Sequence, residues 1–193
     1  MSILFLDTEF TDLLSPQLLS IGMTTNEGEE FYAELDLSSD VGKTRVRTAS
    51  EFVKYGGVLD QWGRVPGATG TEWEIGRRAG EWLLCLTKSS KLPIEIAFDY
   101  SMDFELLEFA VRDAGLWEQV REGILPINIA NLTGSLDGEM AAEECYRELS
   151  KSGGRGIGRH HALADALALR AAYLAAKQIA IASFTPIGAN IPP

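Results

Sequence analysis

Two carboxylates end an apolar run near the start of the chain, in Ile3-Leu4-Phe5-Leu6-Asp7-Thr8-Glu9-Phe10. Residues two positions apart on a strand point to the same side, so we expect Asp7 and Glu9 to face one way together. Buried like charges repel and lose their hydration, and a divalent cation held by oxygen ligands is the usual compensation. A strand that ends in a solvated polar turn would give the same pattern, so these two residues alone do not decide between the alternatives.

A second acidic group, Phe98-Asp99-Tyr100-Ser101-Met102-Asp103, lies where an expected strand ends and an expected helix begins. The helix dipole and the free N–H groups of the first turn favour a carboxylate at this position. Helix capping therefore explains at least one of Asp99 and Asp103 without any further function.

A third group, His160-His161-Ala162-Leu163-Ala164-Asp165, opens an alanine-rich helix and contains the only two histidines of the chain. The neighbours of Asp165 are almost all Ala and Leu, among which an unpaired charge would be costly. His160 precedes Asp165 by five positions and can lie beside it at the junction of loop and helix. The alternative is a pair of surface histidines and a solvated aspartate.

Taken in order, these groups resemble the motifs of the DEDDh 3′–5′ exonucleases. Asp7-Thr8-Glu9 matches the first motif, Asp103 the second, and His160 with four residues before Asp165 the third. The sequence His-His-Ala-Leu-Ala-Asp-Ala is close to the family pattern His-x-Ala-Leu-x-Asp-Ala.

The resemblance extends from residue 3 to about residue 175, with departures in the first two motifs. Phe10 and Asp12 replace Thr and Gly of the family's Asp-x-Glu-Thr-Thr-Gly-Leu, Asp99 stands where Asn is common, and Met102 replaces Phe. The opening of the chain is most similar to the bacterial branch that resembles the exoribonuclease ribonuclease AS.

The second motif is degenerate and can be aligned with the family pattern in two ways. Asp103 is followed by Leu106 and Leu107 at the spacing that the family shows after its catalytic aspartate, so we assign the motif to Asp103. Asp99 is the alternative ligand.

The resemblance implies a ribonuclease H-like fold that binds two Mg²⁺ or Mn²⁺ ions through Asp7, Glu9, Asp103 and Asp165. Two ions ~3.5–4 Å apart bind the attacking and leaving oxygens during phosphodiester hydrolysis. His160 would take the proton of the attacking water, since free imidazole titrates at ~6.5 and is largely neutral at pH 7. We expect activity to rise from neutral to alkaline pH, and the metal-loaded protein to be the more stable form.

Substrate contacts are expected on both sides of the catalytic residues. By resemblance, the backbone around Phe10 and Thr11 holds the terminal 3′-hydroxyl and Leu13 forms an apolar wedge against the last bases. Phe10 either stacks on a base, a contact worth ~1–3 kcal/mol, or packs in the core. Arg155 and Arg159, in the glycine-rich loop before His160, are candidates for phosphate contacts, and a solvated basic loop is the alternative. Arg45 and Arg47 are less defined candidates.

Hydrophobic periodicity predicts an α/β fold with a mixed sheet, made of an antiparallel three-strand meander plus parallel strands and flanked by helices. Strands are predicted at residues 2–8, 17–24, 30–35, 93–98 and 124–129. Helices are predicted at residues 71–88, 101–115, 141–149 and 161–180. Residues 38–70 read as loop, with one short helix near 49–59.

Length and composition favour a single domain over residues 1–193, with an irregular tail after about residue 184. No run approaches the ~20 apolar residues of a membrane span, and the start lacks a basic signal-peptide region, so we expect a cytoplasmic protein with no membrane partner. Cys85 and Cys145 lie far apart and read as free thiols. A net charge of −11 argues against nonspecific coating of nucleic acid.

The expected function is therefore 3′–5′ exonucleolytic cleavage at single-stranded 3′ ends, with RNA favoured over DNA by the branch resemblance alone. A homodimer is compatible with the aromatic content of residues 71–88. The alternatives are a nucleic-acid-binding module that no longer cleaves, an endonuclease of ribonuclease H type and a small-nucleotide phosphodiesterase.

Overall fold

The computed structural model describes residues 2–151 and 155–184, and it has a six-stranded mixed sheet with helices on both faces. The strand order is β4-β3-β2-β1-β5-β6. The strands are β1 (Ile3–Phe10), β2 (Leu18–Thr25), β3 (Glu30–Leu35), β4 (Thr69–Gly70), β5 (Ile94–Phe98) and β6 (Ile124–Asn128). The predicted α/β class and helix-flanked mixed sheet are confirmed.

Eight α-helices are found among the described residues, together with two short 3₁₀ helices. The α-helices are α1 (Asp40–Thr48), α2 (Glu51–Tyr55), α3 (Glu72–Ser89), α4 (Ser101–Asp113), α5 (Trp117–Val120), α6 (Ala130–Thr133), α7 (Leu136–Ser150) and α8 (Ala162–Phe184). The 3₁₀ helices are η1 (Leu59–Gln61) and η2 (Arg121–Gly123).

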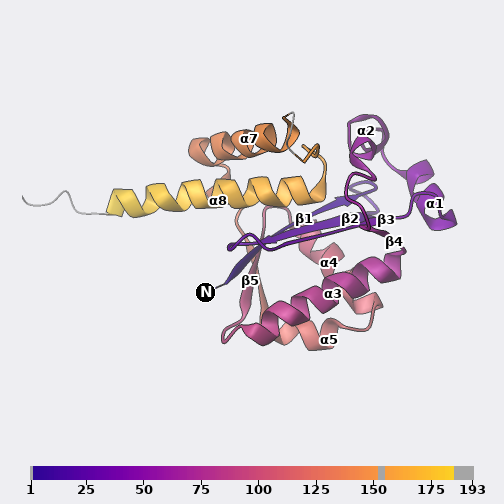
Figure 1. Ribbon diagram of the computed structural model, residues 1–193, viewed down its shortest axis with the longest axis horizontal. Helices are drawn as coiled ribbons and strands as arrows, with labels where there is room; N and C mark the ends of the chain where they lie inside the picture. Colours follow the sequence, from indigo (N-terminus) through magenta and orange to yellow (C-terminus); the bar gives the residue numbers. More distant parts are fainter. Residues whose placement is uncertain (1, 152–154, 185–193) are drawn as a thin grey trace, which may run out of the picture.

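Strand β1 lies in the middle of the sheet and is covered on both faces. It pairs antiparallel with β2 and parallel with β5, and β2 pairs antiparallel with β3, which gives the predicted meander. The face that carries Leu4 and Leu6 packs on the core beneath α3 and α4. The opposite face carries Ile3 and Phe5 and packs against α8. Figure 1 shows α7 and α8 on one side of the sheet and α3, α4 and α5 on the other.

The start of α3 follows from its sequence. The Thr71 hydroxyl accepts a hydrogen bond from the backbone N–H of Glu74, and the Glu74 carboxylate accepts one from the Thr71 N–H at 2.8 Å. This reciprocal capping box satisfies two N–H groups that the helix itself cannot pair.

Helix α1 replaces part of the predicted loop. The Ser39 hydroxyl caps it by accepting a hydrogen bond from the Gly42 N–H at 3.0 Å. Buried Arg45 holds α1 against β2 and α3, because its guanidinium donates a hydrogen bond to the Leu18 carbonyl and forms an ion pair with Glu72. Its glycine, threonine and valine residues are weak helix formers, so these tertiary contacts stabilise a helix that local propensity does not predict. Arg45, a less defined candidate for a phosphate contact, is buried, and its guanidinium binds groups inside the fold.

The first turn of α8 touches β2 at Gly22. A Cβ at this position would overlap the backbone of Ala162 and Leu163, so only glycine allows the helix to come this close. Gly22 is also the β-ladder partner of Asp7 on β1. The close approach therefore brings the start of α8 to the place on the sheet where the first carboxylate motif lies.

Two expectations concern the ends of the chain and membranes. The irregular tail predicted after residue 184 lies outside the described residues. Within the ranges that the structure describes, no helix is both long and apolar enough to cross a bilayer.

We expect Gly22→Ala to lower the free energy of unfolding by about 1–3 kcal/mol or more, because the added methyl must displace the backbone of α8. Ser20→Ala is the matched control, since it removes one atom on the same strand and the same face and should cost about 1 kcal/mol or less. Urea unfolding at equilibrium measures both. An equal effect of the two variants would contradict the close approach.

Candidate active site

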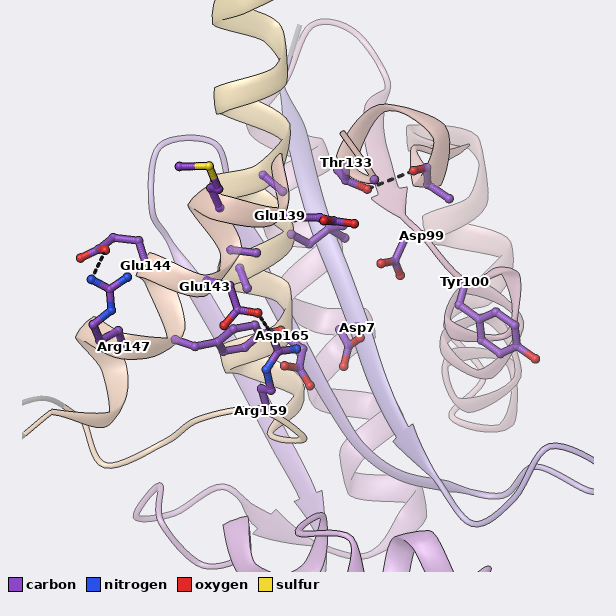
Figure 2. Close-up of a pocket in the computed structure, with 18 of the residues that line it drawn as sticks. Asp7, Asp99, Tyr100, Thr133, Glu139, Glu143, Glu144, Arg147, Arg159 and Asp165 are labelled. Carbon is purple, nitrogen blue, oxygen red and sulfur yellow. Dashed lines mark hydrogen bonds and ion pairs between the residues drawn. The ribbon is translucent and has the colours of Figure 1, made fainter. Parts of the chain in front are cut away.

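A cleft of about 1020 Å³ opens between α7, the N-terminal half of α8 and the ends of β1 and β5. Its lining comes from segments far apart in the sequence and includes Asp7, Asp99, Glu143, Tyr146, Arg159, His160 and Asp165. Figure 2 shows the carboxylates of Asp7, Asp99 and Asp165 around this cleft. The structure thus brings residues of the first and third sequence motifs to one cleft, along with Asp99 of the second group.

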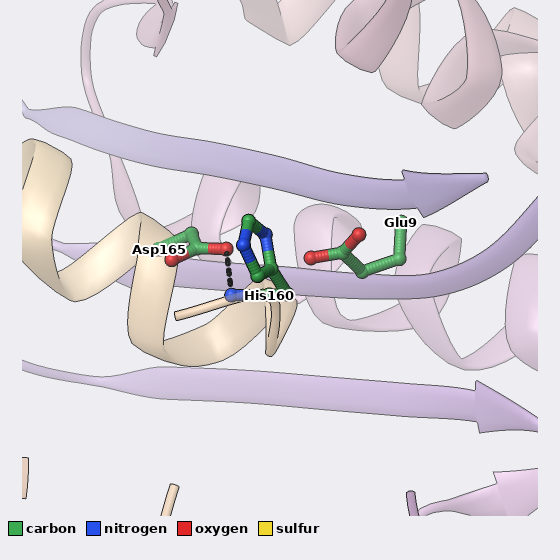
Figure 3. Close-up of side chains that lie close together, drawn as sticks. All are labelled: Glu9, His160 and Asp165. Carbon is green, nitrogen blue, oxygen red and sulfur yellow. Dashed lines mark hydrogen bonds between the residues drawn. The ribbon is translucent and has the colours of Figure 1, made fainter. Parts of the chain in front are cut away.

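Glu9, His160 and Asp165 form the tightest group of possible metal ligands found among the described residues. One ligand atom from each of the three lies within 4.8 Å of those of the other two. In Figure 3 the imidazole of His160 lies between the two carboxylates. An imidazole between two carboxylates can bind a cation with them or exchange a proton near a bound cation.

The backbone around His160 is held in an unusual conformation. His160 has φ 64°, which makes it the only non-glycine residue with positive φ in the part of the chain that the structure describes. Its N–H donates a hydrogen bond of 3.0 Å to the Asp165 carboxylate. A left-handed residue costs energy unless its surroundings impose it, and such residues concentrate at functional sites. The bond to Asp165 is one of the contacts that impose it here.

Burial and mutual repulsion dominate the electrostatics of the carboxylates. Burial, and then the charge of Asp165, raises the pKa of Glu9 to about 9. Burial also raises the pKa of Asp7, and the charges of Asp103, Asp165 and Glu9 raise it further. The pKa of Asp165 rises through burial as well, while hydrogen bonding from Tyr146 opposes the rise. Without a cation these groups therefore hold protons that solvent-exposed carboxylates would lose.

The two acidic residues of the second motif have different surroundings. Strand β5 runs beside β1 only as far as Phe5, so the Thr8 amide on that edge lacks a ladder partner. Asp103 accepts hydrogen bonds from the Thr8 N–H at 3.1 Å and the Thr8 hydroxyl at 2.7 Å, and it is 2% exposed. Asp99 instead lines the cleft with Asp7 and Asp165.

These surroundings favour Asp99 as the residue that faces a ligand in the cleft, and they give Asp103 a structural role at the edge of β1. Asp103 remains close enough for its charge to raise the pKa of Asp7. The assignment of the second motif to Asp103 therefore stays a prediction, with Asp99 as the competing ligand.

The predicted substrate-binding residues after β1 lie in three different environments. Thr11 is buried and accepts a hydrogen bond from the Gln17 N–H at 3.0 Å, which closes the turn between β1 and β2. Leu13 is 69% exposed and free to contact a ligand. Phe10 packs at the margin of the core and stacks on Tyr100, with ring centroids 6.2 Å apart.

The two arginines of the glycine-rich loop also differ. Arg159 lines the cleft, where it pairs with Glu143 and lies 4.4 Å above the ring of Tyr146. Arg155 pairs with Glu30 on β3 and is absent from the cleft lining. Only Arg159 of this pair is therefore placed beside the carboxylates.

The neighbouring His161 has a structural role. It is 1% exposed, and its ring stacks on Tyr32 with centroids 4.2 Å apart. Burial lowers its pKa to about 4, so it is neutral at pH 7. This placement agrees with the choice of His160 over His161 as the residue available for proton transfer.

Sequence reasoning missed several residues around the site. Tyr146 lines the cleft together with Asp165, and the Phe52 ring lies edge-on against His160 with centroids 4.9 Å apart. Glu139, Glu143 and Glu144 place an acidic rim along the α7 side of the cleft. An amphipathic helix such as α7 carries many polar residues, and nothing in the sequence marks which of them face α8.

We expect a divalent cation to stabilise the protein increasingly as pH rises from 6 to 9, because it competes with the protons that the carboxylates hold. In the metal-free protein, a Glu9 whose pKa rises from 4.5 to about 9 holds a proton that the unfolded chain loses. Its contribution to stability therefore falls as pH rises through that interval. Thermal melts with and without Mn²⁺ across this range, with calorimetry in buffers of different ionisation enthalpy, measure the stabilisation and the protons released.

Glu9→Gln is the matched variant for this measurement. It should raise the free energy of unfolding of the metal-free protein by on the order of 1 kcal/mol or more at pH 8, because folding no longer has to protonate a carboxylate that is ionised in the unfolded chain. The same variant should lose most of the stabilisation by Mn²⁺. If the stabilisation by Mn²⁺ is independent of pH, or equal in Glu9→Gln and the wild-type protein, then Mn²⁺ does not bind at these carboxylates.

Asp99→Asn and Asp103→Asn separate the two candidates of the second motif. If Asp99 is the ligand, Asp99→Asn weakens Mn²⁺ binding at least about tenfold and leaves the stability of the metal-free protein almost unchanged. Asp103→Asn should then mainly destabilise the fold, by about 1–3 kcal/mol, because Thr8 loses its charged acceptor. The reverse pattern in Mn²⁺ titrations and urea melts would assign the site to Asp103.

Comparison with known proteins gives this chain no family. A scan against protein-family models and a search of curated protein sequences both found no match. Its function must therefore be inferred from its own residues and their arrangement.

Proposed function

We propose that this chain is a metal-dependent 3′–5′ exonuclease of the DEDDh type on a ribonuclease H-like fold, acting on single-stranded 3′ ends with RNA preferred to DNA. The observation that carries the proposal is the convergence of Glu9, His160 and Asp165 within 4.8 Å, with His160 and Asp165 at the wall of a cleft that Asp7 also lines. The order of the motifs along the chain and the mixed sheet flanked by helices are compatible with it. A module that only binds nucleic acid has no use for a buried anionic cluster of this kind.

The donor set fits Mg²⁺ or Mn²⁺. Asp7, Glu9 and Asp165, with either Asp99 or Asp103, offer the hard carboxylate oxygens that these ions prefer. Their raised pKa values mean that the cluster needs nearby positive charge to stay ionised. Two such ions, when bound, would neutralise the scissile phosphate and stabilise the leaving 3′-oxygen.

His160 supplies the proton acceptor. Its ring lies at the cleft wall between the two carboxylates, where it can take a proton from the attacking water. The carboxylate of Asp165 holds the backbone of His160 through the 3.0 Å hydrogen bond to its N–H. The same Asp165 carboxylate is a proposed metal ligand, so this bond fixes the proton acceptor relative to one of the ligands.

Substrate contacts are proposed on two sides of these residues. Arg159 lies at the cleft and can exchange its ion pair with Glu143 for one with a phosphate, which binds a guanidinium through two parallel hydrogen bonds. Tyr100 lines the cleft and is exposed, and Leu13 is exposed after β1, so we propose that these apolar and aromatic side chains cover an unstacked terminal base. Phe10 stacks on Tyr100, so we expect Phe10 to orient the Tyr100 ring rather than to contact the base itself.

The acidic rim of the cleft favours a second candidate, a phosphodiesterase for very short oligonucleotides. Glu139, Glu143 and Glu144 lie along the wall formed by α7. Arg159 and Arg147 pair with Glu143 and Glu144, so the charge of Glu139 is the one that would repel a longer phosphate backbone there. A dinucleotide carries a single internal phosphate and avoids most of this repulsion. Both candidates use the same catalytic residues, and substrate length distinguishes them.

We expect the protein to release mononucleotides from 3′ ends of labelled single-stranded oligomers in Mg²⁺ or Mn²⁺, and to lose this activity in chelator. RNA and DNA series from 2 to about 20 nucleotides measure the preference for sugar and length. His160→Ala should lower kcat by about 10²–10⁴-fold, the usual contribution of a positioned general base.

Arg155→Ala is the control variant, since Arg155 lies in the same loop but pairs with Glu30 away from the cleft. It should keep nearly full activity. A covalently closed circular substrate should remain uncut, because an exonuclease needs a free end. Cleavage of the circle, or full activity of His160→Ala, would refute the proposed mechanism, and cleavage of dinucleotides alone would select the second candidate.

A further inference from the structure

The loop that carries His160 contacts two parts of the protein. On one side Arg159 pairs with Glu143 of α7. On the other side residues 156–160 meet the segment from Ser50 to Arg64, which contains α2 and η1 where the sequence predicted one short helix near 49–59. Ion pairs between exposed side chains such as Arg159 and Glu143 hold a backbone weakly. The contacts with the segment 50–64 are an aromatic ring contact and hydrogen bonds to the loop backbone.

We propose that the segment 50–64 is the positioning element for His160, and that Phe52, Gln61 and Arg64 are its positioning residues. The Phe52 ring meets the His160 imidazole edge to face, with an interplanar angle of 89°. Gln61 and Arg64 hold the backbone of the loop that leads to His160. The inference rests on the proposed role of His160 in proton transfer, and it adds the group of residues that determines where this imidazole lies.

Phe52 is more exposed than its apolar character favours. It is 55% exposed on the short helix α2, so burial in the core does not account for it. Edge-to-face contact between aromatic rings has a preferred geometry, and Phe52 therefore restricts the rotation of the imidazole that it touches. Gly57, two residues after the end of α2, also lies close to this ring, since an added Cβ would be in van der Waals contact with the His160 Cδ2 at 3.8 Å.

Gln61 and Arg64 act on the loop backbone. The Gln61 amide oxygen accepts a hydrogen bond of 3.2 Å from the Gly158 N–H. Arg64 donates to the Gly156 carbonyl and also to the Asp60 carbonyl, which ties the loop to the end of η1. Gly156 and His160 both have positive φ, so this loop depends on external contacts to keep its path.

The segment is itself fixed to the sheet. The Gly63 N–H donates to the buried Glu34 carboxylate at 3.1 Å, and the Trp62 indole N–H donates to the Leu35 carbonyl at 2.9 Å. At its other end the Ser50 N–H donates to the Thr11 carbonyl at 2.9 Å. Thr11 follows the strand that carries Glu9, so the segment connects the end of β1 to the His160 loop and sets the separation between the acid motif and the imidazole.

The main variants are Phe52→Ala, which removes the ring contact, and Phe52→Tyr, which keeps it. Phe52→Ala should lower kcat on a labelled single-stranded oligomer by about 10–100-fold and change KM less than about threefold, because a misplaced imidazole impairs the chemical step. Phe52→Tyr should restore most of kcat. In a His160→Ala background, Phe52→Ala should have almost no further effect, since the two residues act as a unit.

Tyr55→Ala is the matched control, because it removes an aromatic ring that lies on the same helix and is 80% exposed. It should behave like the wild-type protein. If Phe52→Ala and Tyr55→Ala both raise KM and leave kcat unchanged, α2 is a base-stacking surface and the positioning role is wrong. Gln61→Ala should reproduce the loss of kcat, whereas Gln61→Glu keeps an acceptor for the Gly158 N–H and should retain kcat. If Gln61→Ala has a normal kcat, the positioning role belongs to Phe52 alone and the proposal for the segment is overturned.

A spectroscopic measurement separates this inference from the proposed activity. The chain contains only two histidines, so its imidazole NMR spectrum has two sets of ring signals, and buried His161 serves as the internal reference. Phe52→Ala should shift the His160 signals through the lost ring current and leave those of His161 in place. If the wild-type protein cleaves no oligonucleotide but this shift is seen, the proposed function fails and the contact stands. Unshifted His160 signals would refute the contact itself.

Discussion

Negative charge held out of water at the end of β1 is the constraint on which the rest of the site depends. The structural features that build the site bring the carboxylates together there. Gly22 lets the first turn of α8 reach the sheet, and this brings Asp165 to Glu9. The strained backbone of His160 then places an imidazole between the two carboxylates. A fold selected for stability alone would separate these groups, and the proposed function gives a reason for their convergence.

The apolar faces of the sheet allow this arrangement to persist. Leu4 and Leu6, on the face opposite Asp7 and Glu9, are fully buried in the largest hydrophobic cluster, so β1 is anchored whether or not its carboxylates are compensated. Asp103 shows that a buried carboxylate beside this strand can find internal partners in the amide and hydroxyl of Thr8, although burial still raises its pKa to about 7. Two acidic groups of the same motif thus have different surroundings, because one accepts hydrogen bonds from Thr8 and the other faces a cleft.

The sequence predicted the parts of this protein that depend on local pattern. Alternation placed Asp7 and Glu9 on one face, the capping box at Thr71 located α3, and the alanine-rich run located α8. It missed α1, whose weak helix formers are held by Arg45 through contacts with Leu18 and Glu72 across the fold. The choice between Asp99 and Asp103 depends on where β5 stops pairing with β1, and the contact of Phe52 with His160 joins residues more than a hundred positions apart. Such facts belong to the tertiary structure, and no short-range pattern encodes them.

The ion pairs around the cleft bear on how a polyanion could bind to so acidic a protein. Both arginines that line the cleft are already paired, Arg159 with Glu143 and Arg147 with Glu144. Substrate binding on the proposed mechanism therefore gains little from permanent positive charge on the protein, and metal ions must supply most of the compensation for the phosphate. Few counterions would then be released from the nucleic acid by protein side chains, so affinity should depend weakly on monovalent salt and strongly on divalent cation. This combination suits an enzyme that takes hold of one strand end, where a single phosphate meets the ions, and it does not suit a protein that binds along a duplex.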